Sequence, residues 1–167
     1  SNLNPGYFQG NGYDVMFSVA QQNNLIISIS AYPDGLIELK NISETYPEVP
    51  IVIENMGNIF KEKNNFEKCL DDLCQLSSNR NFYLKLSGFN GVSNKKPSLD
   101  LLLLSIEKLS SVFSPNRLMW GSNYPFQVLH ETYEDSMSIL KNDCTFLSEV
   151  QKQQILSDTA RNLFFNS

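Results

Sequence analysis

Four short apolar runs, separated by segments with helical spacing, constrain the fold of this chain more than any other feature. The runs are LIISIS at residues 25–30, PIVIENMG at 50–57, FYLKLSG at 82–88 and RLMWGSN at 117–123. Near-continuous apolar runs of this length are typical of strands in a parallel sheet that is covered on both faces. Residues 36–47, 64–79 and 98–113 carry apolar side chains three and four positions apart, as amphipathic helices do. The alternation predicts an α/β fold with a parallel sheet.

Further helices are predicted at both ends of the chain. Residues 12–22 form the helix that precedes the first strand, and two helical stretches follow the last strand at residues 131–142 and 148–165. Pro47 ends one helix, and Ser98 is placed to cap another. No linker or low-complexity segment divides the chain, so we expect residues 1–167 to form a single domain.

Composition and charge exclude several classes of function. The chain has 167 residues with a formal net charge of −5 and no basic stripe, which argues against a nucleic-acid partner. No apolar run approaches the ~20 residues of a membrane span, and the first residues lack the pattern of a secretion signal. The three cysteines share no recognisable spacing, so we expect reduced thiols and a cytoplasmic protein.

Polar residues gather at the predicted carboxyl ends of the four strands. They are Ser28 and Ser30 on the first, Glu54 and Asn55 on the second, Lys85 and Ser87 on the third, and Ser122 and Asn123 on the fourth. Each alone also fits a small polar residue that bonds to loop backbone. In parallel α/β folds this edge of the sheet carries the active site. Their convergence on one edge favours a site for a small-molecule ligand.

Four segments resemble, in order and at matching spacing, motifs of the amidohydrolase-related (amidohydrolase 2) TIM-barrel hydrolases and lactonases. RLMWGSNYPF is similar to the family's RLMWGSDWPV, and PEVPIVIENMGN to its apolar run followed by Asp-His-x-Gly. NFYLKLSGF and ILSDTARNLFF match two further motifs. The resemblance implies a partial (β/α)8 barrel of the TIM type, with this chain supplying about the C-terminal half, strands five to eight. It also implies hydrolysis of a lactone, an amide or a related carboxylic substrate.

Two departures from the family pattern concern the chemistry. Asn123 stands where the family has an Asp that acts as general base, and Asn55 stands where it has a His. An amide cannot take a proton near neutral pH, and Asn55 lacks the imidazole for metal ligation or proton shuttling. Family members often use a divalent metal such as zinc, but we expect no metal site and no cofactor in this chain. The hydrolase is therefore predicted to be weakly active or inactive. The alternative is a noncatalytic descendant that binds a ligand or a protein at the same edge.

Lys85 alone among the retained residues keeps a strongly interacting group at the family site. Its ammonium can bind a carboxylate or polarise a carbonyl, or it can instead form an ion pair with Glu54. Glu54 occupies the position before the family His and is expected to support the site. His130, the single histidine, is a candidate substrate contact, or else an ordinary surface or helix-start residue.

Four βα units make half of a (β/α)8 barrel and leave two open strand edges. Three explanations are open. The chain is a fragment of a longer protein, or it completes the barrel by pairing with a second copy or a companion chain. The third is that it stands alone as an open four-stranded sheet. We expect a homodimer or an assembly with a companion chain. Light scattering should report a species larger than 19.0 kDa, and a monodisperse species of that mass would contradict the expectation.

Overall fold

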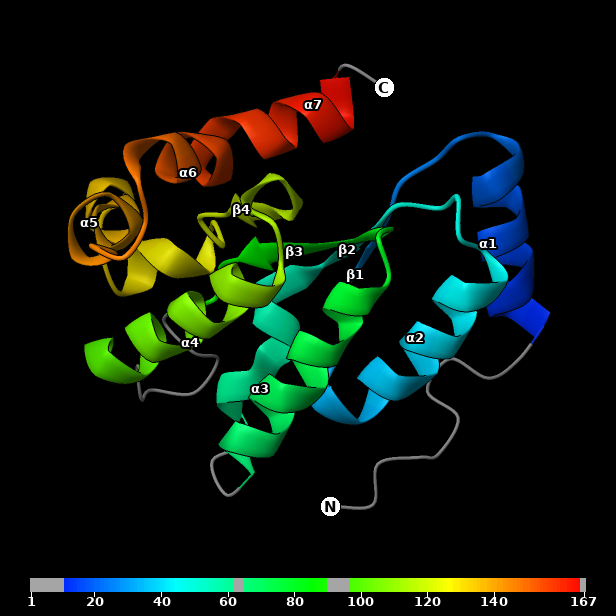
Figure 1. Cartoon of the computed structure of the whole chain (residues 1–167), viewed down its shortest axis with the longest axis horizontal. Coiled ribbons are helices and arrows are strands. Elements are labelled where there is room, and N and C mark those ends of the chain that lie inside the picture. The colour runs from blue at the N-terminus through cyan, green and yellow to red at the C-terminus, as the bar shows by residue number, and fades with distance from the viewer. Residues whose placement is uncertain (1–10, 62–64, 90–96, 166–167) are drawn as a thin grey trace. The chain divides into compact units, whose positions relative to one another are not determined.

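The computed structural model describes residues 11–61, 65–89 and 97–165 (Figure 1). The chain divides into two compact units, Ser1–Tyr83 and Leu84–Ser167. The four strands are assigned to one sheet in the order β1-β2-β3-β4. Helices and strands alternate along the chain, as the apolar pattern predicted. Each unit is described by itself below.

Among its described residues, the first unit has three α-helices, two complete strands and the start of a third. The complete elements are α1 (Asn11–Gln22), β1 (Ile27–Ile29), α2 (Leu36–Thr45), β2 (Ile51–Ile53) and α3 (Phe66–Gln75), with short 3-10 segments at Pro33–Gly35, Glu54–Lys61 and Leu76–Ser78. β1 pairs with β2 in parallel, with Ile27 opposite Ile51 and Ile29 opposite Ile53. The backbone N–H of Ile51 donates to the carbonyl of Asn81, 2.8 Å away. The parallel pairing predicted for this part of the sheet is confirmed.

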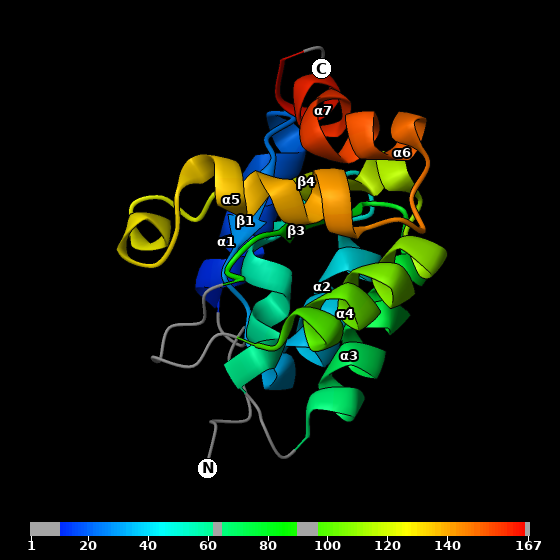
Figure 2. The ribbon, with the colours of Figure 1, turned by 90° about the vertical axis from the view of Figure 1, so that its left-hand side faces the viewer.

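The second unit begins within β3 (Phe82–Leu86), whose first two residues belong to the first unit. It continues with α4 (Leu99–Val112), β4 (Leu118–Trp120), α5 (Tyr133–Ser138), α6 (Glu149–Gln153) and α7 (Thr159–Phe165), and with 3-10 segments at Pro115–Arg117 and Phe126–Leu129. β3 pairs with β4 in parallel, with Leu84 opposite Leu118. A wider π segment at Gln154–Asp158 joins α6 to α7, so the last predicted helix is one continuous element (Figure 2).

The burial of the strands follows their sequence pattern. All three residues of β2 are fully buried, whereas in β1 the exposed Ser28 lies between buried Ile27 and Ile29. Because side chains alternate along a strand, Ser28 and Ser30 belong to the same face of β1. The apolar side chains that fill the core therefore leave the serine positions exposed.

The caps of two helices follow the expected chemistry. The Ser98 hydroxyl accepts a hydrogen bond from the backbone N–H of Leu101, which satisfies one free donor of α4. Thr132 caps α5 in a reciprocal pair with Asp135, so this helix begins two residues later than the predicted residue 131.

All four strands end earlier than predicted, and the difference is largest in the second and the fourth. The second predicted strand continued to residue 57, but the backbone leaves extended geometry after Ile53 and becomes left-handed at Asn55. The fourth was predicted to end at residue 123, yet β4 stops at Trp120. In both places the residues past the strand form the loops that carry the candidate site.

The structure bears on the expectations of reduced thiols and of no membrane span. Cys69, Cys74 and Cys144 are not joined in disulfides. Burial raises the pKa of the Cys144 thiol to about 12, with a further upward contribution from Asp143, so this thiol stays protonated at neutral pH. Across the described residues, no helix combines the length and apolar character that a membrane span requires.

Candidate active site

In the first unit, the polar ends of β1 and β2 are joined by side-chain hydrogen bonds. The Ser28 hydroxyl donates to Oε1 of Glu54, the first residue after β2, over 2.5 Å. The bond fixes the carboxylate beside the exposed face of β1. The structure thus brings Ser28 and Glu54 together. The alternative ion pair between Glu54 and Lys85 stays a prediction, since those residues belong to different units.

A left-handed turn follows β2 and carries Asn55. Four consecutive residues have positive φ angles: Asn55 (53°), Met56 (50°), Gly57 (60°) and Asn58 (53°). Left-handed geometry costs a residue with a Cβ roughly 1–2 kcal/mol, although Asn tolerates it better than most. A run of such residues needs tertiary contacts to hold it, and Met56 supplies one because its side chain is fully buried.

Asn58 provides the polar anchor of this turn. Its side chain is 6% exposed. Nδ2 donates to the carbonyl of Ala31 over 2.8 Å and to the Ser30 hydroxyl over 3.4 Å. Asn58 therefore ties the end of β1 to the turn that carries Asn55. Asn58 is not among the predicted site residues, although the Asn and Gly residues of ENMGN are a signal for left-handed backbone.

Lys61 is a second residue that the sequence analysis missed. Its ammonium donates to the Tyr32 hydroxyl over 2.9 Å and lies 4.4 Å from the centre of the Tyr32 ring. Tyr32 follows β1, and Lys61 ends the segment that follows β2. The first unit thus holds a cation at its strand ends that the family motifs did not indicate.

In the second unit, Lys85, Ser87 and Gly121 lie against one another. A Cβ built on Gly121 would be 2.8 Å from Cδ of Lys85, 3.0 Å from its Cγ and 3.2 Å from Cβ of Ser87. The backbone N–H of Gly121 donates to the carbonyl of Leu86 over 3.1 Å, which continues the β3–β4 pairing by one residue. Two predicted site residues, one on β3 and one directly after it, are therefore brought beside the loop that leads to Asn123.

Ser122 and Asn123 shape that loop. The Ser122 hydroxyl accepts from the backbone N–H of Tyr124 over 3.2 Å, a local turn contact of the kind that short polar residues commonly make. Asn123 is partly exposed and has a φ of 60°. Its carbonyl accepts from the N–H of Gln127 over 3.3 Å. Asp tolerates left-handed backbone much as Asn does, so the backbone at 123 would accept either side chain.

His130 is exposed and ends the 3-10 segment Phe126–Leu129. Its backbone N–H donates to the carbonyl of Gln127 over 3.0 Å. His130 is thus a surface residue that ends a 3-10 segment, whereas the alternative interpretation expected a surface or helix-start residue. The role of His130 as a substrate contact stays a prediction.

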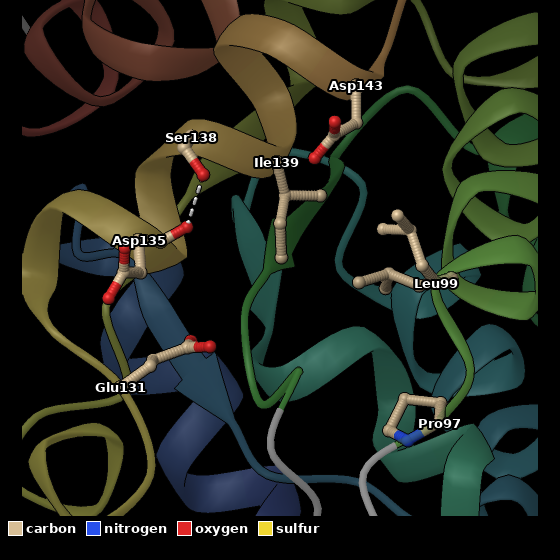
Figure 3. A pocket seen from close by; sticks show the side chains of 8 residues that line it. Pro97, Leu99, Glu131, Asp135, Ser138, Ile139 and Asp143 are labelled. Atoms are coloured by element: carbon tan, nitrogen blue, oxygen red, sulfur yellow. Dashed lines mark hydrogen bonds between the residues drawn. The ribbon is translucent and has the colours of Figure 1, made fainter.

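A cavity of about 350 Å³ lies elsewhere in the second unit, between the start of α4 and the α5 region. It is lined by Pro97, Leu99, Leu102, Glu131, Asp135, Ser138, Ile139 and Asp143. Figure 3 shows the carboxylates of Glu131 and Asp135 on one side, with Leu99 and Pro97 on the other. None of the predicted site residues is among them. Three carboxylates make this lining unsuitable for an anionic ligand, so the cavity is separate from the site built around Lys85.

The residues at the family positions do not fit a divalent metal such as zinc. Zinc in proteins is held by Cys, His and carboxylate ligands, whereas Asn55 and Asn123 offer neutral amides. Within residues 11–61, 65–89 and 97–165, no three His, Cys, Asp or Glu side chains gather in a group that could hold a metal ion. No chemical step is therefore assigned to a metal.

Comparison with known proteins decides the family. The sequence model of the family described as Amidohydrolase matches residues 2–165. The chain belongs to the amidohydrolase family. Its resemblance to the four amidohydrolase motifs is thereby confirmed.

Solved amidohydrolase structures share the fold. An amidohydrolase from Burkholderia multivorans with bound zinc has a TM-score of 0.82 at 17% identity, over 92% of this chain and 57% of that one. A putative 2-pyrone-4,6-dicarboxylic acid hydrolase from Pseudomonas putida has a TM-score of 0.77 at 20% identity, over 93% and 57%. The α/β fold of the TIM-barrel type is confirmed, and this chain supplies about half of the barrel.

A match to a curated relative also covers most of this chain but only half of the relative. The uncharacterized protein y4mH of Sinorhizobium fredii is 20% identical over 148 residues, which are 89% of this chain and 50% of that protein. The chain thus spans about half the length of the curated relative that it matches.

Proposed function

We propose that this amidohydrolase-family chain supplies half of a TIM-barrel site for a carboxylate-bearing lactone, amide or related substrate, with hydrolysis that is weak or absent. The observation that carries the proposal is the amide of Asn123 at the position of the family's general base, on a loop whose backbone suits an Asp equally well. The neighbouring Lys85 keeps a charged group that can hold such a substrate. Binding is thus retained while proton transfer is lost.

The residues divide the work as follows. The Lys85 ammonium binds a substrate carboxylate or stabilises negative charge on a carbonyl oxygen. The Asn123 side chain can accept a hydrogen bond from water through Oδ1, but it cannot take the proton that the attacking water must lose. In the first unit, the Ser28 hydroxyl holds the carboxylate of Glu54 at the strand ends. The expected result is a site that binds and orients its ligand without efficient attack.

The names of two relatives support a carboxylate-bearing ligand. The Pseudomonas putida protein is described as a putative hydrolase of 2-pyrone-4,6-dicarboxylic acid, a lactone with two carboxyl groups. A probable hydrolase of the same acid from Acinetobacter baumannii has citric acid bound in its structure, at 20% identity and a TM-score of 0.75. Both molecules carry carboxyl groups, with which a lysine ammonium forms charge-assisted hydrogen bonds.

The remaining half of the barrel is proposed to come from a companion segment or a second copy of the chain. These two sources share one consequence, which is that the site needs strands beyond the four described here. A noncatalytic binding protein is the second candidate function, favoured by the neutral amides at two of the family's catalytic positions.

Citrate binding by the intact protein tests the proposal. Calorimetric titration should show binding that weakens about tenfold or more in Lys85→Ala, because a charge-assisted hydrogen bond contributes ~1.5–3 kcal/mol. Lys141→Ala, which removes an exposed cation from the segment after α5, is the matched control and should leave binding unchanged. Turnover of lactones or amides by the unaltered protein at ~1 s⁻¹ or faster, a rate usual for enzymes, would overturn the weak-hydrolysis part.

A further inference from the structure

Gly121 occupies a place where the structure has no room for any larger residue. The atoms nearest to a Cβ on Gly121 are Cδ and Cγ of Lys85, at 2.8 and 3.0 Å, and Cβ of Ser87 at 3.2 Å. Carbon atoms in contact are normally 3.5–4.0 Å apart. The two lysine carbons belong to the middle of the stem and not to its free end. An added methyl group would therefore displace the stem as a whole.

The backbone of neither Gly121 nor Lys85 can easily shift to relieve this contact. Gly121 is hydrogen-bonded to Leu86 through its backbone N–H, which holds it against β3. Lys85 lies within β3 itself, paired with Met119 of β4. The overlap with a Cβ at 121 would have to be relieved by rotation about the first side-chain torsions of Lys85. Because the ammonium lies at the end of a four-carbon stem, such a rotation moves it further than any other atom of the side chain.

The backbone conformation at position 121 does not require a glycine. The positive-φ residues of the described chain are Asn24, Asn55, Met56, Asn58 and Asn123, with the glycines Gly57 and Gly88, and Gly121 is not among them. An alanine would thus be free of backbone strain at 121. The requirement for glycine lies in the space that the Lys85 stem fills.

We propose that Gly121 is a positioning residue of the carboxylate site, which fixes the direction of the Lys85 ammonium by leaving its stem a slot beside β4. The inference rests on the proposed function for its ligand, but the packing that it describes does not. Gly121 acts mainly through Lys85, whose Cδ and Cγ are closer to a Cβ at 121 than Cβ of Ser87 is, and it is not itself a substrate contact. A chain with Ala at 121 would keep the lysine and its charge but hold the charge in the wrong place.

The test uses Gly121→Ala in the intact protein, with Gly12→Ala in α1 as the matched control, because nothing lies within 4 Å of a Cβ at Gly12. We expect Gly121→Ala to weaken citrate binding about tenfold, close to the loss in Lys85→Ala. The rate at which acetic anhydride modifies the Lys85 amine, followed by mass spectrometry, should change several-fold. Gly12→Ala should alter neither.

Stability of the double variant separates positioning from a general packing defect. Lys85→Ala removes Cγ and Cδ, so Gly121→Ala should lower the unfolding midpoint less in that background than in the unaltered chain. Folding of the double variant where Gly121→Ala alone fails to fold would support the inference in the same way. Equal losses in both backgrounds, or failure of both variants to fold, would overturn it. Unchanged Lys85 labelling in a folded Gly121→Ala protein would do so as well.

The two proposals fail in different ways. If citrate binding is the same in the unaltered protein and in Lys85→Ala, the proposed function fails. The labelling rate and the double-variant comparison would still decide whether Gly121 positions the Lys85 stem.

Discussion

Hydrolysis of a lactone or amide should rise ~10²–10⁴-fold when Asn123→Asp is combined with Asn55→His, because a general base contributes about that factor. Asn and Asp have nearly the same shape, and the left-handed backbone at 123 accepts both. The first substitution restores a group that can take a proton from water. The second restores an imidazole at the position where the family has its His. Values of kcat/KM on a panel of lactones and amides, together with the zinc content of each purified variant, measure the outcome.

A matched substitution controls for the change in charge. Asn24 also has a left-handed backbone, with a φ of 52°, and is exposed. Asn24→Asp therefore adds the same carboxylate in the same conformation at a place that carries no candidate site residue, and it should leave activity unchanged. If the double reversion yields no more hydrolysis than Asn24→Asp, the general-base interpretation of Asn123 is wrong. The noncatalytic binding protein would then be the better description.

The fold was predictable wherever one local pattern decides it. The apolar residues of β2 are all buried, and Ser28 interrupts the buried residues of β1 as its alternation indicates. Parallel pairing followed from near-continuous apolar runs that alternate with helices, and the β1–β2 and β3–β4 registers confirm it. These features depend on side-chain period and burial, which a sequence displays directly.

The site was predictable as a set of positions but not as a set of contacts. Spacing along the sequence predicts the polar ends of the strands, but it also predicts a strand through Asn55, where the structure has a left-handed turn. Its geometry depends on the buried side chain of Met56 and on the bond from Asn58 to Ala31, which lies 27 residues earlier. The contact between Gly121 and Lys85 depends on the register of two strands. Contacts of both kinds arise between distant segments, and no local window of the sequence contains them.

Asn58→Ala should lower the free energy of unfolding by ~2–5 kcal/mol, since two separate costs add. Alanine in left-handed geometry costs ~1–2 kcal/mol, and the buried carbonyl of Ala31 loses its 2.8 Å donor at ~1–3 kcal/mol. Urea unfolding followed by circular dichroism gives the difference between the variant and the unaltered protein.

Two matched variants separate these costs. Asn24→Ala imposes the same backbone penalty at an exposed residue with a φ of 52°, and should lower stability by only ~1–2 kcal/mol. Asn58→Gly removes the backbone penalty but still leaves Ala31 without its donor, so its loss should approximate the hydrogen-bond share alone. If Asn58→Ala and Asn24→Ala cost the same, the bond to Ala31 contributes nothing, and the turn is held by the buried Met56. A larger loss at 58 than at 24 means that the link between β1 and the Asn55 turn holds both strand ends in place, including the one that carries Ser30.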